Sequence, residues 1–220
     1  PDPSAYADAR TVLDRYGIEV PASIAERLDR GQSGELEETP GPDASLFDRV
    51  SNHVLVGGHT AIEAAREVAE RRGYHTRLLS ARLRGEAAAA GLTHVAVAEE
   101  AFDTGEPVGT PGVVLSGGET TVTLGEDPGT GGPNQELALR AAVELPEGAV
   151  LGSVDTDGRD GATDAAGALV DAATVEDADA AREALAGHDA GPFLEERGAL
   201  LRSGRTGTNV NDLRVLVVPE

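Results

Sequence analysis

One stretch of the sequence, residues 151–171, reads LGSVDTDGRDGATDAAGALVD, and the other segments are interpreted around it. Its apolar start predicts a buried strand, and the apolar pattern from Ala165 onward predicts a helix. The loop between them carries four aspartates, Asp155, Asp157, Asp160 and Asp164. Carboxylates this close repel one another at neutral pH, so we expect a metal ion, an arginine or a bound cationic group to offset the repulsion.

The acidic loop is the first candidate site, because open α/β sheets bind ligands at the carboxyl ends of their strands. The alternative is a solvated acidic loop, since acidic residues are abundant throughout the chain. The spacing excludes an EF-hand calcium loop: Asp160 stands where that loop needs Gly, and Ala166 where it needs Glu. A metal here is therefore expected to be Mg²⁺ that bridges a phosphate.

The composition favours an acidic protein with one large or two small domains. Its 220 residues are 40% hydrophobic but only 3% aromatic, which predicts a core of Ala, Val and Leu. The 39 acidic residues outnumber 18 basic ones, all of them arginine, and the net charge is −21. Such a lysine-free acidic chain resembles proteins of extreme halophiles, in which salt screens self-repulsion. Nucleic acids and anionic membranes are poor partners for this surface.

The absence of certain residue types excludes several further kinds of functional site. Without lysine, the chain has no lysine nucleophile and no Walker-type phosphate lysine. Without cysteine, disulfides and thiolate metal sites are excluded. No apolar run approaches the length of a membrane span and no secretory start is visible, so we expect a cytoplasmic protein. The sequence starts at Pro1 and contains no methionine, which suggests a processed or truncated chain.

The first half of the sequence predicts helices at residues 4–16, 21–28, 61–72 and 85–100, with strands at 50–56 and 74–80. The order around residues 50–80 is that of a βαβ unit with a right-handed crossover. Its turn, Gly57-Gly58-His59-Thr60, places free backbone N–H groups at a helix start, which suits an anion. Gly and Pro residues after position 104 indicate a domain boundary near residue 107.

The second half predicts a hairpin, in which strands at residues 113–115 and 120–124 flank a Ser-Gly-Gly-Glu turn. Residues 129–136 enter a helix with Pro133 at its first position, and their exposed amides make a plausible phosphate cradle. Further helices are expected at 176–185 and 192–201, and a last strand at 213–218. Before that strand, residues 203–212 fit either a ligand loop or a flexible one. No Gly-x-Gly-x-x-Gly occurs, which counts against a standard dinucleotide fold.

Four segments in one order resemble the MOFRL module of the glycerate 2-kinases, a family long named as hydroxypyruvate reductases. They are residues 116–120, 131–136, 153–167 and 206–213. Residues 1–107 resemble the latter part of the larger domain of that family. The resemblance implies an α/β fold: the C-terminal portion of a Rossmann-like α/β/α domain (1–107), followed by a smaller α/β MOFRL domain with a mixed sheet (108–220).

The resemblance also implies an activity: transfer of the ATP γ-phosphoryl group to the 2-hydroxyl of D-glycerate, with Mg²⁺, in a cleft between two α/β domains. The catalytic candidates that it implies are Asp155, Asp157, Asp160 and Arg205, of which Asp155 and Asp157 are also the metal candidates. The candidates for binding the nucleotide or substrate are Ser116, Gly117, Gly118, Glu119, Thr120, Asn134, Gln135, Glu136, Thr206, Thr208 and Asn209.

Two departures from the family pattern bear on these expectations. Many relatives have Arg where this chain has Pro133, so Arg205 is the candidate for the missing positive group. The family's N-terminal half, with its glycine-rich loop and lysine, is absent, so we expect this chain to be inactive alone. Its expected partners are glycerate, a nucleotide, that missing half and, in a homo-oligomer, further copies. The alternatives are an NAD(P)H-dependent hydroxypyruvate reductase and a non-catalytic module whose acidic loop holds a structural cation.

Overall fold

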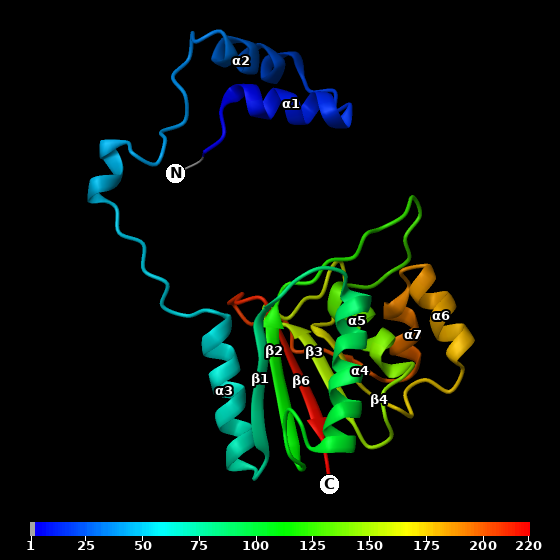
Figure 1. Ribbon diagram of the computed structural model, residues 1–220. Helices are drawn as coiled ribbons and strands as arrows, with labels where there is room; N and C mark the ends of the chain where they lie inside the picture. Colours follow the sequence, from blue (N-terminus) through cyan, green and yellow to red (C-terminus); the bar gives the residue numbers. More distant parts are fainter. Residues whose placement is uncertain (1–2) are drawn as a thin grey trace. The chain divides into compact units, whose positions relative to one another are not determined.

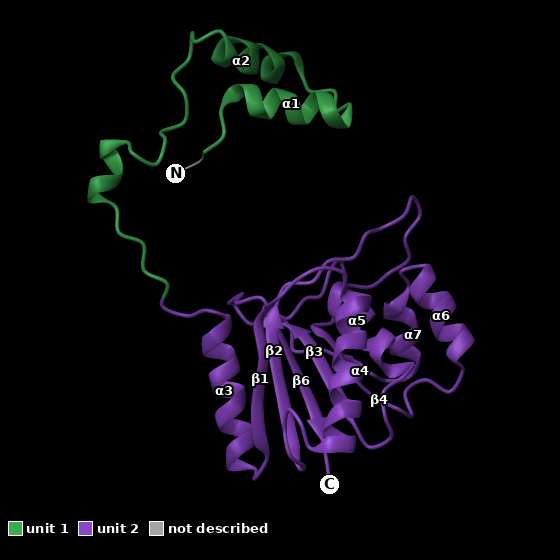
Figure 2. Ribbon diagram, in the orientation of Figure 1, with its two compact units in different colours: residues 1–54 green, residues 55–220 purple. Residues whose placement is uncertain are grey.

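The computed structural model describes residues 3–220, which form two compact units that divide between Val54 and Leu55 (Figure 2). The first unit contains helices α1 (Tyr6–Tyr16) and α2 (Ala22–Gln32) and the short 3-10 helix η1 (Ser45–Arg49). The ring of Tyr6 lies directly on Gly31, where any Cβ would stand 2.2 Å from the ring. The two helices of this unit therefore pack through a glycine contact.

The second unit is built on a six-stranded mixed sheet with the order β1-β2-β6-β3-β4-β5 (Figure 1). β1 and β2 are parallel, and every other neighbouring pair is antiparallel. The strands are β1 (His75–Leu83), β2 (Gly112–Gly118), β3 (Val150–Asp155), β4 (Gly167–Asp171), β5 (Leu200–Leu201) and β6 (Asp212–Val218). The α/β fold with a mixed sheet is thus confirmed.

Helices cover both faces of this sheet (Figure 1). Helix α3 (Gly58–Arg71) packs on β1 and β2 through Ile62, against Val113 and Leu115. The larger core lies on the other face, because alternate residues of a strand point to opposite sides. Its helices are α4 (Ala87–Thr104), α5 (Pro133–Ala142), α6 (Ala178–Ala186) and α7 (Ala190–Glu196).

Most of the predicted elements are present, and the Ala-rich core is confirmed. The expected strand at residues 50–56 is wrong: the segment is irregular, and Val54 and Leu55 are 87% and 88% exposed. Without that strand there is no βαβ unit around α3. The parallel pair of the sheet is instead β1 and β2, which α4 connects.

Three further expectations fail because tertiary pairing overrides the local pattern. The predicted hairpin is absent: β2 continues through Gly118 and pairs with β6, and residues 120–124 form only an isolated bridge from Thr121 to Glu86. The expected helix after Ala165 is instead strand β4, which pairs antiparallel with β3. The expected helix at residues 192–201 ends at Glu196, and β5 follows.

The expected domain boundary at residue 107 does not separate compact units. Strand β1 and helix α4 precede it, yet they share one sheet and one core with β2 and α5, which follow it. As a division between family domains, 1–107 and 108–220 remains a prediction. Within residues 3–220, no helix is both long and apolar enough to cross a membrane.

Candidate functional site

Two rows of polar residues cross the sheet at the end where β2 and β3 finish and β6 begins. The register pairs Ser116 with Arg214 and Arg214 with Ser153. One step further along, Asp212 pairs with both Gly118 and Asp155. Three segments far apart in the sequence therefore bring their polar residues to one end of the sheet, on the face that α4 and α5 cover.

Asp212 is the centre of this arrangement. Its carboxylate accepts hydrogen bonds from Nδ2 of Asn134 at 2.8 Å and from the backbone N–H of Thr120 at 3.4 Å. It also accepts one from Nη2 of Arg214, which in turn donates to Oγ1 of Thr120 at 2.9 Å. Sequence reasoning quoted Asp212 within a motif but did not single it out. Its position directly before the last strand was the available signal.

Arg214 is a buried cation that sequence reasoning missed. Its side chain is fully buried, and burial lowers its pKa, while the neighbouring Asp212 raises it. Within the described part of the chain, its Nε and Nη1 atoms have no hydrogen-bond partner. A charge held this way is stabilised mainly by its carboxylate partner, so loss of Asp212 would leave an uncompensated buried guanidinium.

Asp160 caps helix α5 from inside the protein. One carboxylate oxygen accepts from the backbone N–H and the side chain of Asn134 at 3.0 and 3.2 Å, and the other from the same groups of Gln135 at 2.8 and 3.0 Å. Gly132 permits this approach, since a Cβ there would lie 2.4 Å from the Asp160 carboxyl carbon. Burial raises the pKa of Asp160 to about 6, against four hydrogen bonds that favour its charged form.

This cap corrects the expected phosphate cradle. The amides at the start of α5 are already bonded to a carboxylate of the same chain, so they are not free for a ligand. Asp160 is only 1% exposed, and its position fits a structural cap rather than a metal ligand or a base. Asn134 and Gln135 are likewise buried, and Asn134 also accepts from Ser153 Oγ at 2.6 Å.

The segment 116–120 divides between the interior and the surface. Ser116 is buried and lies 2.8 Å from Nε2 of His94, whose Nδ1 lies 2.7 Å from the Ala90 carbonyl. Because that carbonyl can only accept, Nδ1 carries the proton and Nε2 accepts from the serine. Burial lowers the pKa of His94, which keeps this ring neutral. Gly117 and Thr120 are also buried, so Ser116, Gly117 and Thr120 support the sheet end.

The other two residues of that segment, Gly118 and Glu119, face a pocket of about 740 Å³. Its wall includes Gly57 and Gly58 at the start of α3, where the sequence predicted an anion site. Glu119 accepts a hydrogen bond from Nδ2 of Asn211, which ties the pocket to the loop before β6. The Gly-Gly-His-Thr turn therefore meets two of the family segments, residues 116–120 and 206–213, but none of the four aspartates.

The acidic loop and the loop before β6 are joined by a set of hydrogen bonds. Thr206 donates from its backbone N–H to the Asp157 carbonyl at 3.1 Å and from its hydroxyl to the Thr156 carbonyl at 2.6 Å. Thr156 donates from its hydroxyl to the Asn211 carbonyl at 2.7 Å. Gly158, at φ 88°, passes so close to Gly204 that a Cβ would lie 1.9 Å from its carbonyl oxygen. Thr206 is thus a structural link between the loops.

Between these joined loops lies an open polar pocket of about 610 Å³. Asp157 lines it, and the side chains of Arg159 and Arg205 bring positive charge from the two loops. Arg205 forms no hydrogen bond or ion pair with another residue of the described chain, so it is available to an anion. Thr208 and Asn209 complete the polar lining. Of the sequence candidates, Asp157, Arg205, Thr208 and Asn209 therefore meet in one cavity.

Asp155 stands at the end of β3 beside this pocket. One of its oxygens accepts the backbone N–H of Asp157 at 3.0 Å. Partial burial, together with the charges of Asp157, Asp212 and Glu119, raises its pKa. Within residues 3–220, no group of three or more Asp, Glu or His side chains is placed to hold a metal. Asp164 does not line the polar pocket and instead forms an ion pair with Arg202 at 3.3 Å.

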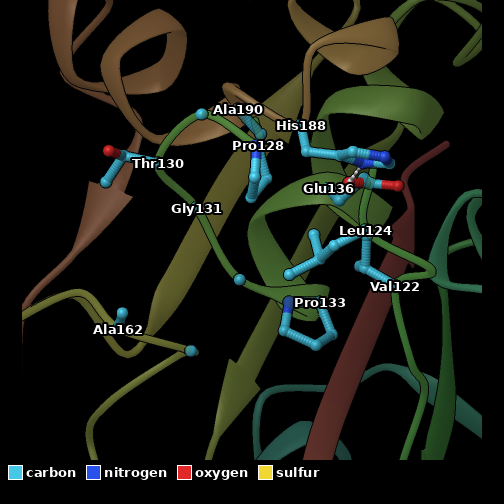
Figure 3. A pocket seen from close by; sticks show the side chains of 13 residues that line it. Val122, Leu124, Pro128, Thr130, Gly131, Pro133, Glu136, Ala162, His188 and Ala190 are labelled. Carbon is cyan, nitrogen blue, oxygen red and sulfur yellow. Dashed lines mark hydrogen bonds and ion pairs between the residues drawn. The ribbon is translucent and has the colours of Figure 1, made fainter. Parts of the chain in front are cut away.

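Glu136, the last candidate, lies in a different cavity of about 360 Å³ (Figure 3). It is 7% exposed, and its carboxylate lies 3.0 Å from Nδ1 of His188. His188 was missed from the sequence, because a single histidine after an Ala-rich helix carries no recognisable pattern.

The MOFRL family matches residues 112–212, the span that contains β2 to β5, helices α5 to α7 and both joined loops. Nearly all residues of the polar rows, the α5 cap and the two loops lie within this matched region.

Similarity to glycerate kinases extends over nearly the whole chain. A glycerate 2-kinase of Pyrococcus horikoshii is 38% identical over 99% of this chain and 50% of its own length. A D-glycerate 2-kinase of Thermotoga maritima is 37% identical over 97% of this chain and 50% of its own. A protein of Agrobacterium vitis named as a hydroxypyruvate reductase is 37% identical over 99% of this chain and 49% of its own.

Solved structures agree with the sequence matches. The crystal structure of the T. maritima glycerate kinase superposes with a TM-score of 0.78 at 36% identity, covering 99% of this chain and 51% of that one. A P. horikoshii structure gives 0.73 at 36% identity over 100% and 51%. The chain thus spans about half the length of the relatives that it matches.

Proposed function

We propose that the protein containing this chain is an ATP-dependent glycerate 2-kinase, which converts D-glycerate and ATP to 2-phosphoglycerate and ADP. The similarity to glycerate kinases over nearly the whole chain supports this proposal. The observation that carries it is the polar pocket, which Asp157 lines together with Arg159 and Arg205, while Asp155 accepts the backbone N–H of Asp157. This combination of anion-binding and carboxylate groups is what a phosphoryl-transfer site needs.

The side chains of this pocket have distinct roles in the proposal. Phosphoryl transfer depends on positioning and on neutralising phosphate charge more than on a covalent nucleophile. Arg159 and Arg205 donate to phosphate oxygens, and Arg205 supplies the positive group that Pro133 does not. Thr208 and Asn209 donate further hydrogen bonds. Asp157, half-buried and held by the Arg159 backbone N–H at 2.8 Å, accepts the hydrogen bond of the glycerate 2-hydroxyl.

Asp155 and Asp157 are the residues that would hold Mg²⁺. Magnesium is commonly bound by one or two carboxylates together with substrate phosphates, so a site of two carboxylates is sufficient. Partial burial first, and then the charges of Asp157, Asp212 and Glu119, raise the pKa of Asp155, and a bound cation would relieve that negative charge, which fits this donor set. When bound, Mg²⁺ would neutralise charge on the phosphates. Asp160 acts indirectly, because it fixes the start of α5 below the loop.

The second candidate is an NAD(P)H-dependent hydroxypyruvate reductase, which the name of the A. vitis relative favours. Hydride transfer requires a nicotinamide site, and the sequence has no Gly-x-Gly-x-x-Gly fingerprint. The third is a binding module with a structural cation, which does not account for the free arginine in the pocket.

Product analysis of the complete protein at high salt separates these functions. Incubation with glycerate and ATP should yield 2-phosphoglycerate and ADP. Oxidation of NADH by hydroxypyruvate, independent of ATP and without phosphorylated product, would establish the reductase instead. If neither reaction occurs, the non-catalytic binding module is the function that remains.

A further inference from the structure

The cavity around Glu136 has the size and lining of a small-molecule site. Its volume of about 360 Å³ lies within the range of ligand pockets, roughly 300–1,000 Å³. The wall is mostly apolar, formed by Val122, Leu124, Pro128, Pro133 and Ala190. Gly129, Gly131 and Gly132 complete one side, where the wall is formed by backbone atoms without side chains. The proposed roles of Asp155 and Asp157 make no use of this cavity.

One end of the cavity holds a polar pair. Figure 3 shows Glu136 and His188 together at this end, Ala162 at the other, and Leu124 and Pro133 between. An ionised carboxylate only accepts, so the 3.0 Å contact makes Nδ1 of His188 the donor. In the tautomer that carries only this proton, Nε2 is an acceptor, and no other described residue is bonded to it. The pair presents a fixed acceptor to an N–H group.

The backbone at His188 is held in an unusual conformation. Its φ is 53°, in the left-handed region that non-glycine residues rarely adopt. Bonds between its neighbours and the glycine-rich wall hold it there: Gly129 N–H donates to the Gly187 carbonyl at 2.8 Å, and Thr130 N–H to Asp189 Oδ1 at 2.8 Å. Strained backbone conformations cluster at ligand-binding and active sites, so this conformation favours a binding role for His188.

The apolar cavity opens beside the polar pocket. Gly161 and Ala162 line both, so the two hollows are neighbours across one turn of chain. The first offers apolar walls with one hydrogen-bonding end, and the second offers Arg159 and Arg205. A ligand that fills both must have a flat, mostly apolar head with an N–H group, and an anionic tail. A purine nucleoside triphosphate has this form.

We propose that the cavity lined by Leu124, Pro133 and His188 binds the purine base of the nucleotide, whose phosphates lie in the pocket of Arg159 and Arg205. Nε2 of His188 accepts from the amino group of the base, and Leu124 and Pro133 cover its faces. The inference rests on the proposed kinase function and adds where, and by which residues, the base is recognised.

The test compares a ligand that has a base with one that has none. Dissociation constants of the complete protein are measured by calorimetry for ATP and for inorganic tripolyphosphate. Leu124→Ala removes an exposed wall residue, and His188→Asn removes the ring but keeps a residue that tolerates positive φ. Leu169→Ala, an exposed leucine on β4 outside the cavity, is the matched control.

Both cavity variants should weaken ATP binding by about tenfold while tripolyphosphate binding changes less than about twofold. Leu169→Ala should change neither. Equal loss for both ligands, or unchanged ATP binding in both variants, would overturn the assignment. If the unmodified protein binds no tripolyphosphate, the ATP constants alone decide by the same criterion.

The outcome is separable from the kinase proposal. If the protein phosphorylates glycerate but the variants show no selective loss of ATP affinity, the kinase function stands and the base site is removed. If the variants lose ATP affinity but not tripolyphosphate affinity, and the protein does not phosphorylate glycerate, the base site stands and the kinase function is removed.

Discussion

Asp160 illustrates, at the scale of single residues, how a motif can be recognised and its role misjudged. The sequence places it among four aspartates, and nothing in the spacing distinguishes it from Asp157. The difference arises in three dimensions: Asp160 is buried on the amides of α5, whereas Asp157 lines an open pocket. Burial of this kind depends on Gly132, 28 positions earlier, and could not be read locally.

The raised pKa of Asp160 predicts a pH dependence of stability. The folded state holds the proton up to about pH 6, whereas the unfolded state releases it near 3.8. The stabilisation is therefore full below the lower value and lost as pH rises through the upper one. Asp160→Asn cannot titrate, so the unfolding free energy of the unmodified protein minus that of the variant should fall by on the order of 3 kcal/mol from pH 4 to 6.5.

Urea unfolding of both proteins at constant ionic strength measures this difference. Using the difference removes the titration of the many other carboxylates, which both proteins share. A difference that stays level across the window, or that rises with pH, would mean that Asp160 is already ionised at low pH.

Gly158 gives a second residue-scale prediction. Its φ of 88° and the 1.9 Å approach to the Gly204 carbonyl leave no room for a side chain. Gly158→Ala should lower the unfolding free energy by about 3 kcal/mol or more, because the two loops must separate. Gly204→Ala is the matched control: it also has positive φ but open space around it, so its cost should be only about 1–2 kcal/mol. Equal costs would show that the loops do not pack as described.

Elements with a clear helical period could be predicted from sequence, whereas strand partners could not. Helices α1 to α6 and strands β1 and β6 follow from apolar spacing and from Gly or Pro at their ends. The hairpin after β2 failed because its expected partner is displaced by β6, which lies almost 100 residues away. The helix predicted after Ala165 is instead strand β4, because a short Ala-rich run has no decisive period.

The contact of helices α4 and α5 predicts an inverted effect of a common substitution. Gly to Ala inside a helix usually stabilises by about 0.5–1 kcal/mol. At Gly91 a Cβ would lie 2.6 Å from the Leu137 carbonyl oxygen on α5, so Gly91→Ala should instead destabilise by about 1–3 kcal/mol. Thr93→Ala, exposed on the same helix, should change little. Thermal unfolding followed by circular dichroism distinguishes the two, and a stabilised Gly91→Ala protein would refute the close packing.

For the whole molecule, the charge balance is the property that sequence conveys best. A net charge of −21 opposes compaction, and most ion pairs of the described chain are at the surface. Raising NaCl from about 0.1 M to about 2 M should therefore raise the melting temperature by on the order of 10 °C. A melting temperature that is unchanged or lower at high salt would show that self-repulsion is not what limits stability.

The candidate site was predicted in part. The family segments were identified from sequence, and Asp157, Arg205, Thr208 and Asn209 do share a cavity. Ser116, Thr120, Asn134 and Gln135 instead form the buried support of that site, which a list of motif residues cannot distinguish from its lining. Asp212, Arg214 and His188 required the fold, because their partners come from other strands and helices.

The central claim is that the pocket of Asp157 is where phosphate is transferred, and turnover by the Asp157→Asn protein tests it most directly. The complete protein should lose at least about 100-fold in the rate of 2-phosphoglycerate formation, with its unfolding free energy changed by less than about 1 kcal/mol. Asp164→Asn, on the same loop but outside the pocket, should keep its rate within about twofold. An Asp157→Asn protein that turns over as fast as the Asp164→Asn protein would contradict the account.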